Sequence, residues 1–234
     1  GTVNEVVNGL IRAAGDGPTI PFGVLPIGTG NDFNDMAKLP RNINEAAKLF
    51  AAGHTRQIDA GRVQFNGKTH YFDNNCAAAM EPLVTIENEK LIKLSGNMRY
   101  IVALVRALAK LKAWKMKIIW DGGGYEGPIY LLSICNSPRT GGLFPMAPDA
   151  SLDDGLFDFV MAPEIPKITV LAVLARLFQG THIHHKQVTY GRSAHISLVS
   201  EPGSPIHADG EVLTEGATEI IYDILPGKIT LLSP

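Results

Sequence analysis

A glycine-rich segment near the start of the chain contains groups that can bind a phosphate. It runs Pro26-Ile27-Gly28-Thr29-Gly30-Asn31-Asp32, after a short apolar stretch. Glycines let main-chain N–H groups approach an anion, a helix start adds partial positive charge, and the Thr29 hydroxyl can donate a hydrogen bond. No Gly-Lys-Ser/Thr follows, so the segment is not a Walker loop. Its residues alone indicate either an anion site or a plain turn.

A second segment concentrates carboxylates beside a glycine. Asp149, Asp153 and Asp154 fall within six residues, just before Gly155. Carboxylate and carbonyl oxygens suit a hard cation such as Mg²⁺, although a polar turn before a strand explains the same pattern. The preceding residues 137–148 form a loop long enough to be functional.

A third segment, Asp209-Gly210-Glu211, combines a turn signal with a carboxylate. Asp-Gly is common in hairpin turns, and the turn is the favoured interpretation of these residues alone. A carboxylate beside such a turn can also act as a general base toward a hydroxyl.

Histidine and cysteine residues do not form a metal-site pattern. His182, His184 and His185 match neither a helix face nor a zinc signature, and we expect a solvated helix end there. Cys76 and Cys135 stand alone in apolar stretches, so we expect two small buried residues. Cysteines of this kind are typical of a cytoplasmic protein.

The elements that must position these segments change in kind at Gly53-His54. Before this point the pattern predicts helices at 2–14 and 43–52, the first with a Thr2–Glu5 capping box, and a strand at 20–25. After it, strands dominate, which is typical of an antiparallel sandwich or barrel. The expected strands are 56–63, 69–72, 114–120, 127–135, 156–161, 187–190, 194–199, 219–224 and 228–232, with helices at 97–111 and 168–178.

Composition narrows the class of protein. The chain has 234 residues, 45% of them hydrophobic and 19% charged, with a net charge of −2. These values exclude a disordered chain and give no reason to expect a nucleic-acid partner. No apolar run is long enough to span a bilayer, and the start does not resemble a signal peptide. Because the chain opens with Gly1 directly in a helical pattern, we expect it to be a fragment of a longer protein.

One stretch departs from this near-neutral balance. From Lys90 to Lys117 there are eight basic residues and no acidic one. Arg99, Arg106 and Lys110 share one face of the expected helix. A basic amphipathic helix can lie on an anionic membrane surface, and a solvated face over a packed helix is the alternative.

Four motifs taken together resemble the diacylglycerol kinase catalytic superfamily, specifically its soluble bacterial lipid kinases. Residues 1–9 are similar to the end of the family's Gly-Gly-Asp-Gly-Thr-x-Asn-Glu motif and the helix after it. Residues 26–33 are similar to Pro-x-Gly-Thr-x-Asn-Asp-Phe, residues 147–155 to Ala-Pro-Asp-Ala-x-x-Asp-Asp-Gly, and residues 209–211 to the closing Asp-Gly-Glu. The resemblance covers nearly the whole chain, with the motifs in the family's order.

The resemblance implies an α/β plus β fold with the active site between two domains. A truncated NAD-kinase-like α/β nucleotide-binding domain (1–53) would precede an antiparallel β-sandwich lipid kinase domain (54–234), with the last strand a candidate to return to the first domain. The implied reaction is the transfer of the γ-phosphoryl group of ATP to a lipid hydroxyl, with Mg²⁺.

The same resemblance assigns roles to individual residues. Glu211 matches the general base, and Asp153 would face the active site through the water network of the magnesium ion. The remaining implied residues are Gly1, Thr2, Asn4, Glu5, Gly28 and Thr29 for the nucleotide, and Ser151 (carbonyl), Asp154 (carboxylate) and Leu156 (carbonyl) for the metal.

One departure from the family pattern limits these expectations. The Gly-Gly-Asp that precedes Gly1 in the family is absent, so we predict that these 234 residues alone do not phosphorylate lipid and that the function belongs to a longer parent. We expect the parent in the cytoplasm, at the inner membrane surface through Lys90–Lys117. The sequence does not distinguish diacylglycerol, phosphatidylglycerol and a sphingoid base as the lipid acceptor. It does not indicate the oligomeric state. The alternatives are an NAD-kinase-like enzyme with a soluble substrate and a non-catalytic lipid-binding relative.

Overall fold

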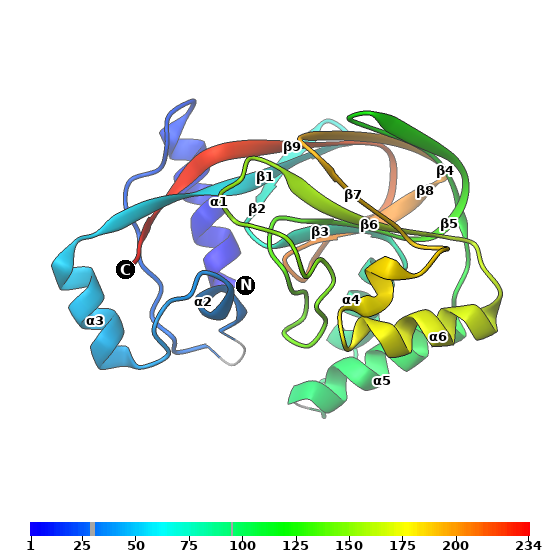
Figure 1. Cartoon of the computed structure of the whole chain (residues 1–234), viewed down its shortest axis with the longest axis horizontal. Coiled ribbons are helices and arrows are strands. Elements are labelled where there is room, and N and C mark those ends of the chain that lie inside the picture. The colour runs from blue at the N-terminus through cyan, green and yellow to red at the C-terminus, as the bar shows by residue number, and fades with distance from the viewer. Residues whose placement is uncertain (29–30, 95) are drawn as a thin grey trace.

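Strands in the second and longer part of the chain pair into one arched sheet (Figure 1). The computed structural model describes residues 1–28, 31–94 and 96–234. Within these residues the sheet order is β2-β1-β9-β8-β3-β5-β6-β7, and every pairing between the named strands is antiparallel. The strands are β1 (Thr55–Phe65), β2 (Lys68–Phe72), β3 (Asn75–Ala79), β4 (Trp114–Trp120), β5 (Gly123–Cys135), β6 (Phe157–Pro163), β7 (Thr189–Ser193), β8 (His195–Ala208) and β9 (Glu211–Leu232).

Two short strands lie end to end between two long ones. β4 pairs with residues 123–129 of β5 and 196–201 of β8. β3 pairs with residues 131–135 of β5 and 206–208 of β8. Because β3 runs antiparallel to β8 and Cys76 pairs with Ala208, the start of β3 lies beside the β8–β9 turn.

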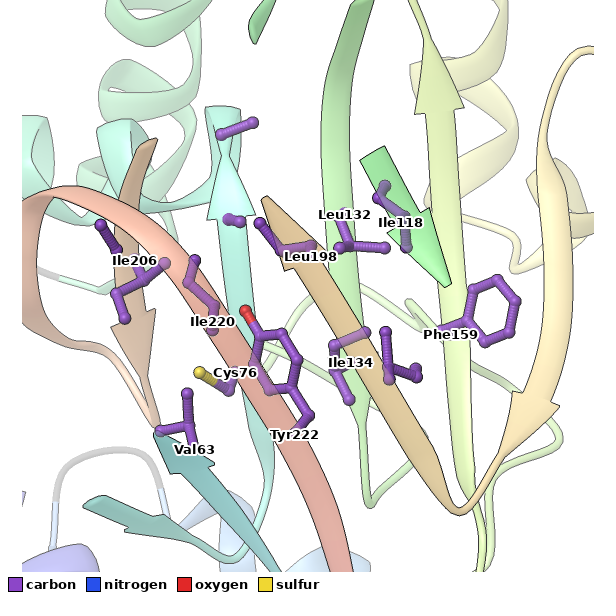
Figure 2. Packing of buried hydrophobic residues seen from close by; sticks show 14 of the residues in the cluster. Val63, Cys76, Ile118, Leu132, Ile134, Phe159, Leu198, Ile206, Ile220 and Tyr222 are labelled. Atoms are coloured by element: carbon purple, nitrogen blue, oxygen red, sulfur yellow. The ribbon is translucent and has the colours of Figure 1, made fainter. Parts of the chain in front are cut away.

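The main core fills the inside of the arch (Figure 2). β4 shows the sequence rule behind it, because Trp114, Met116 and Ile118 are buried while the lysines between them are exposed. Phe72 stacks on Phe157 with 5.6 Å between ring centroids. Burial of large aromatic and aliphatic side chains is the principal stabilising contribution of such a core.

A second core forms where β1 and β9 extend beyond the arch. There Ile58 and Leu231 pack against Val7 and Ile11 of α1 (Thr2–Ala14). Figure 1 shows α1, α2 (Asp32–Met36) and α3 (Ile43–Ala52) gathered at this end of the molecule, near the C-terminus. β1 and β9 therefore run through both parts of the chain, and the predicted domain boundary at Gly53 stays a prediction.

Three helices lie against the other side of the sheet. They are α4 (Met80–Glu89), α5 (Gly96–Ala109) and α6 (Lys167–Leu177), followed by the short 3-10 helix η1 (Thr181–His184). A third apolar cluster joins them to β5 and β6 and includes Met80, Leu104, Leu131 and Leu177. No helix in the described part of the chain is both long and apolar enough to cross a membrane.

Several sequence predictions are confirmed, because the pattern on which they rest is local. Helices 2–14 and 43–52 and strand 114–120 are observed with the expected bounds, and the two cysteines are buried and unpaired. The other expected strands and helices of the second part overlap observed elements, although 219–224 and 228–232 belong to one strand, β9.

Other predictions are wrong. The expected strand at 20–25 contributes a single bridge, Phe22 to Leu231. The Thr2–Glu5 capping box is absent, because helix α1 begins at Thr2 itself and Gly1 is the N-cap. His182 is not solvated: its ring is 2% exposed, with Nε2 3.0 Å from the carbonyl oxygen of Met146.

Candidate active site

Two cavities flank the β8–β9 turn. The first is mainly apolar and lies between α4, α5, α6 and the sheet, where Leu104, Leu131 and Leu174 are among the lining residues. The second lies at the N-terminal end of α1 and is lined by Gly1, Thr2, Gly28 and the segment 22–25 among others. Asn74 and Asp209 line both cavities. The turn therefore stands where the two cavities meet.

Asp209 is held in this position by four hydrogen bonds. Its backbone φ of 48° and the φ of 83° at Gly210 give a left-handed two-residue hairpin turn. Oδ1 accepts from the main-chain N–H groups of Asn74 (3.0 Å) and Asn75 (2.9 Å). Oδ2 accepts from the N–H of Asp73 (3.0 Å) and from Nδ2 of Asn4 (2.5 Å). The carboxylate thus fixes the 73–75 segment and the start of α1 to one point.

The inner face of α1 is attached to β2 by asparagines. Asn8 Nδ2 donates to the Tyr71 carbonyl (2.7 Å), and the Tyr71 N–H donates to Asn8 Oδ1 (2.9 Å). Asn4 also donates to that carbonyl (3.2 Å). Asn8 was not among the predicted site residues, and its signal in the sequence is a polar residue on the apolar stripe of Val7 and Ile11. These bonds set the position of the α1 N-terminus relative to the turn.

Glu211 follows the turn and faces the start of the chain. Its side chain is 40% exposed, and its carboxylate lies beside the main-chain nitrogen of Gly1. The structure therefore brings Glu211 beside Gly1, one of the predicted nucleotide residues, although Glu211 itself is not among the lining residues of either cavity.

The residues predicted to bind nucleotide are not all in one place. Gly1, Thr2, Asn4 and Gly28 line the second cavity, and the Gly28 N–H donates to Asn31 Oδ1 (3.0 Å). Glu5 is exposed on α1 and does not line the described cavities. Thr29 lies outside the described residues.

The residues predicted to bind magnesium belong to an acidic loop, residues 149–156. Ser151 Oγ donates to Asp153 (2.7 Å), and Asp154 forms an ion pair with Arg192 and accepts from the Leu156 N–H (3.1 Å). None of the four predicted residues of this loop, Ser151, Asp153, Asp154 and Leu156, lines either described cavity.

The acidic loop is attached to the sheet by a buried carboxylate, Asp59. Asp59 Oδ2 accepts from the Gly155 N–H (2.7 Å), and Oδ1 accepts from the Gly227 N–H (2.7 Å). Burial raises the pKa of Asp59 despite these two bonds, and the nearby charges of Asp154 and Asp153 raise it further.

A buried polar cluster at the apolar cavity was missed by the sequence analysis. Glu81 Oε1 accepts from Asn75 Nδ2 (2.8 Å) and Thr140 Oγ1 (3.0 Å) and lies 3.5 Å from His207 Nε2. Burial opposes ionisation of Glu81, but the neighbouring His207, Ser133 and Thr140 side chains together lower its pKa below the ordinary value. In Asp73, by contrast, burial and the neighbouring Asp209 raise the pKa well above its ordinary value.

Comparison with known families covers both parts of the chain. The family model of the diacylglycerol kinase catalytic domain matches residues 1–63, and that of the YegS C-terminal NAD kinase beta sandwich-like domain matches residues 76–233. Curated relatives include diacylglycerol kinases of Staphylococcus carnosus (31% identical) and Bacillus subtilis (32% identical). Each alignment covers 90% of this chain, and the chain spans 67% and 68% of these relatives.

Solved structures agree on the fold. A putative diacylglycerol kinase from Bacillus anthracis is 24% identical with a TM-score of 0.78, and the match covers all of this chain and 75% of that one. A yeast NADH kinase complexed with NADH is 12% identical with a TM-score of 0.53, over all of this chain and 60% of that one. The predicted fold class, an NAD-kinase-like α/β part followed by an antiparallel β-sandwich, is confirmed.

Proposed function

Since this chain belongs to the diacylglycerol kinase family, as its motifs predict, we propose that it is the catalytic region of an ATP-dependent lipid kinase. One observation carries the proposal: Asn74 and Asp209 line both the apolar cavity and the cavity at the start of α1. Phosphoryl transfer requires donor and acceptor to meet in line at one point, and the β8–β9 turn offers such a point.

The cavity at the start of α1 is proposed to hold the nucleotide. Gly1, Thr2 and Gly28 line it, and the N-terminal end of a helix favours anionic groups. ATP, when bound there, supplies the phosphoryl group. Asn4 is already committed to Asp209 and Tyr71, so its proposed contribution is to hold α1 in place.

Glu211 is proposed as the general base. It directly follows the Asp209-Gly210 turn, its carboxylate is partly exposed, and it lies beside Gly1 at the nucleotide side. A carboxylate in this place can take the proton from an acceptor hydroxyl as the oxygen attacks. The four hydrogen bonds of Asp209 fix the turn, and the fixed turn would hold the Glu211 carboxylate at a constant distance from the reacting groups.

Magnesium binding by the acidic loop is a separate proposal. The Ser151 and Leu156 carbonyls and the Asp154 carboxylate are hard oxygen donors of the kind Mg²⁺ takes, and Asp59 and Asp153 add negative charge nearby. Arg192 already pairs with Asp154, so a cation there competes with that guanidinium. The ion would offset negative charge at the loop. The proposed role of Asp153 rests on the family resemblance alone.

The apolar cavity supports a lipid rather than a soluble acceptor. A cavity whose lining surface is mainly apolar, with leucine, valine and methionine side chains among the lining residues, favours an acyl chain. This feature argues against an NAD-kinase-like enzyme with a soluble substrate. The assay described next distinguishes a lipid kinase from a non-catalytic lipid-binding relative.

The test is phosphorylation of diacylglycerol in mixed micelles, with radiolabelled ATP and the full-length protein that carries this sequence. We expect Glu211→Gln to lower kcat by at least about a hundredfold, which is the usual contribution of a general base. Glu215→Gln is the matched control, because Glu215 is an exposed carboxylate on the same strand. Turnover that survives Glu211→Gln would remove Glu211 from the mechanism, and absence of turnover with any lipid would favour a non-catalytic relative.

Docking to the inner face of the cytoplasmic membrane is proposed through the helices that cover the apolar cavity. Leu104 of α5 and Leu174 of α6 line the cavity, while Val105 (60% exposed) and Ile168 (76% exposed) on the same helices reach solvent. Lys90 and Lys110 of the basic stretch both pair with Glu87, so the apolar side chains carry more of the docking than the sequence suggests.

Co-sedimentation with phosphatidylglycerol-containing vesicles tests the docking surface. Val105→Glu and Ile168→Glu should weaken binding at least about tenfold, since each places a charge among inserted side chains. Val199→Glu is the control, because Val199 is 51% exposed on β8, away from these helices. Equal loss in all three variants would contradict a specific surface.

A further inference from the structure

Several buried polar atoms of the residues that line the apolar cavity have no hydrogen-bond partner within the described residues, and one of them is a carboxylate oxygen, Oε2 of Glu81. Two carboxylates line this cavity, Asp209 and Glu81. Both oxygens of Asp209 are used by its four donors. The contacts of Glu81 with Asn75, Thr140 and His207 are all made by Oε1, and Ser133 is a further polar neighbour of this side chain. Oε2 is buried and has no hydrogen-bond partner within the described residues.

The chemistry of this atom determines what can satisfy it. Glu81 is 8% exposed, and its lowered pKa keeps it ionised, so both oxygens can only accept hydrogen bonds. A buried charged acceptor without a donor is unfavourable. His207, which is 2% exposed, also has no hydrogen-bond partner for Nδ1 or Nε2 within the described part of the chain, although Nε2 lies 3.5 Å from Glu81 Oε1. Glu81 and His207 thus form the polar end of a cavity that is otherwise chiefly apolar.

Glu81 is directly connected to the proposed point of reaction. Asn75 donates from its main-chain N–H to Asp209 (2.9 Å) and from its side chain to Glu81 (2.8 Å). His207 lies two residues before Asp209 on β8. A lipid with its hydroxyl at the turn therefore has the neighbouring atoms of its head region close to Glu81.

We propose that Glu81 Oε2 is a specificity site that accepts a hydrogen bond from a second donor, a hydroxyl or an amino group, next to the hydroxyl that is phosphorylated. This inference rests on the proposed lipid kinase function and narrows its acceptor. Diacylglycerol has one hydroxyl, and the ester oxygens beside it are acceptors that would face the carboxylate. A monoacylglycerol or a long-chain amino alcohol carries the second donor.

The experiment compares three acceptors in the same micelles: dioleoylglycerol, 1-monooleoylglycerol and a long-chain 2-amino alcohol. With the full-length protein, we expect kcat/KM for at least one of the two acceptors with a second donor to exceed that for dioleoylglycerol by at least about tenfold. The two arms with a second donor distinguish a hydroxyl from an amine. In Glu81→Gln the amide can present its NH₂ group in place of Oε2. The ratio of kcat/KM for the preferred acceptor to that for dioleoylglycerol should therefore fall at least about tenfold.

Two further measurements keep this result separate from misfolding and from failure of the kinase proposal. Glu87→Gln is the matched control on α4, because Glu87 pairs with Lys90 and Lys110 and does not line the cavity. Equilibrium binding of 1-monooleoylglycerol and dioleoylglycerol to the 234-residue chain gives a preference that does not depend on turnover. If no lipid is phosphorylated but Glu81→Gln removes the binding preference, the site stands and the kinase proposal fails. If dioleoylglycerol is used and bound as well as the other acceptors, or if Glu81→Gln leaves the ratio unchanged, the inference is overturned.

Discussion

Replacing Asp209 with asparagine turns one oxygen of a four-bond acceptor into a donor. Whichever way the amide is placed, its nitrogen faces two N–H donors: those of Asn74 and Asn75, or those of Asp73 and Asn4. Each bond to a charged acceptor contributes about 1.5–3 kcal/mol, so the loss of two predicts a destabilisation of about 3–6 kcal/mol. The turn itself is not disturbed, because Asn-Gly is at least as favourable as Asp-Gly with positive φ at both positions.

Urea unfolding followed by circular dichroism measures this destabilisation as a lower midpoint at unchanged m-value. Asp16→Asn, at an exposed position, controls for loss of a carboxylate charge. Adding Asn4→Asp to Asp209→Asn places an acceptor opposite the new amide, and the pair should couple favourably by at least about 1 kcal/mol. A destabilisation by Asp209→Asn below about 1 kcal/mol would refute the reasoning that these four bonds fix the turn.

Three other predictions follow from the packing and the buried charges. Gly61→Ala would place a Cβ 2.1 Å from the fully buried Phe72 ring and should destabilise by about 2–3 kcal/mol in urea, whereas Gly9→Ala, in open space on α1, should stabilise by about 0.5–1 kcal/mol. The raised pKa of Asp73 means that stability falls as pH rises from 3.8 through that raised value, because the unfolded chain loses the proton first; Asp73→Asn should therefore raise the melting temperature more at pH 8 than at pH 4. Both cysteine thiols are buried with raised pKa values, so a thiol-specific reagent should label them only after unfolding, and fast labelling of the native protein would contradict that burial.

Local patterns in the sequence were sufficient for the elements that follow a clear period. The alternation from Trp114 to Trp120 identifies β4, and the apolar stripe of Val3, Val7 and Ile11 identifies α1. β3 was missed because it is short and rich in alanine, with all five residues buried, so it shows no alternation. α4 was missed because Pro82 interrupts its start, yet proline is tolerated in a first turn, where its missing N–H has no helical partner.

The candidate site shows the same division between local and long-range information. The Asp-Gly turn and the glycine-rich segment can be read from neighbouring residues. The partners of Glu81 cannot, because Thr140 is 59 residues away in sequence and is brought to Glu81 only by the folded sheet. The donors to Asp209 lie 134 to 205 residues away. The role of a buried carboxylate depends on such partners. Sequence spacing alone therefore does not identify Glu81 as a candidate site residue.

The position of Glu211 depends on this long-range network more than on its own contacts. Its side chain is partly exposed and is not part of a hydrophobic cluster, so side-chain packing does little to fix it. Its main chain is fixed by the turn just before it, where Asp209 binds α1 through Asn4 and the start of β3 through Asn75. A shift of α1 relative to the sheet would therefore move the nucleotide side of the site and the turn together. Because Asn75 also donates to Glu81, the same bonds set where the polar end of the apolar cavity lies relative to the proposed base. Asp209 is therefore a positioning residue, because its hydrogen bonds fix the places of both cavities relative to Glu211.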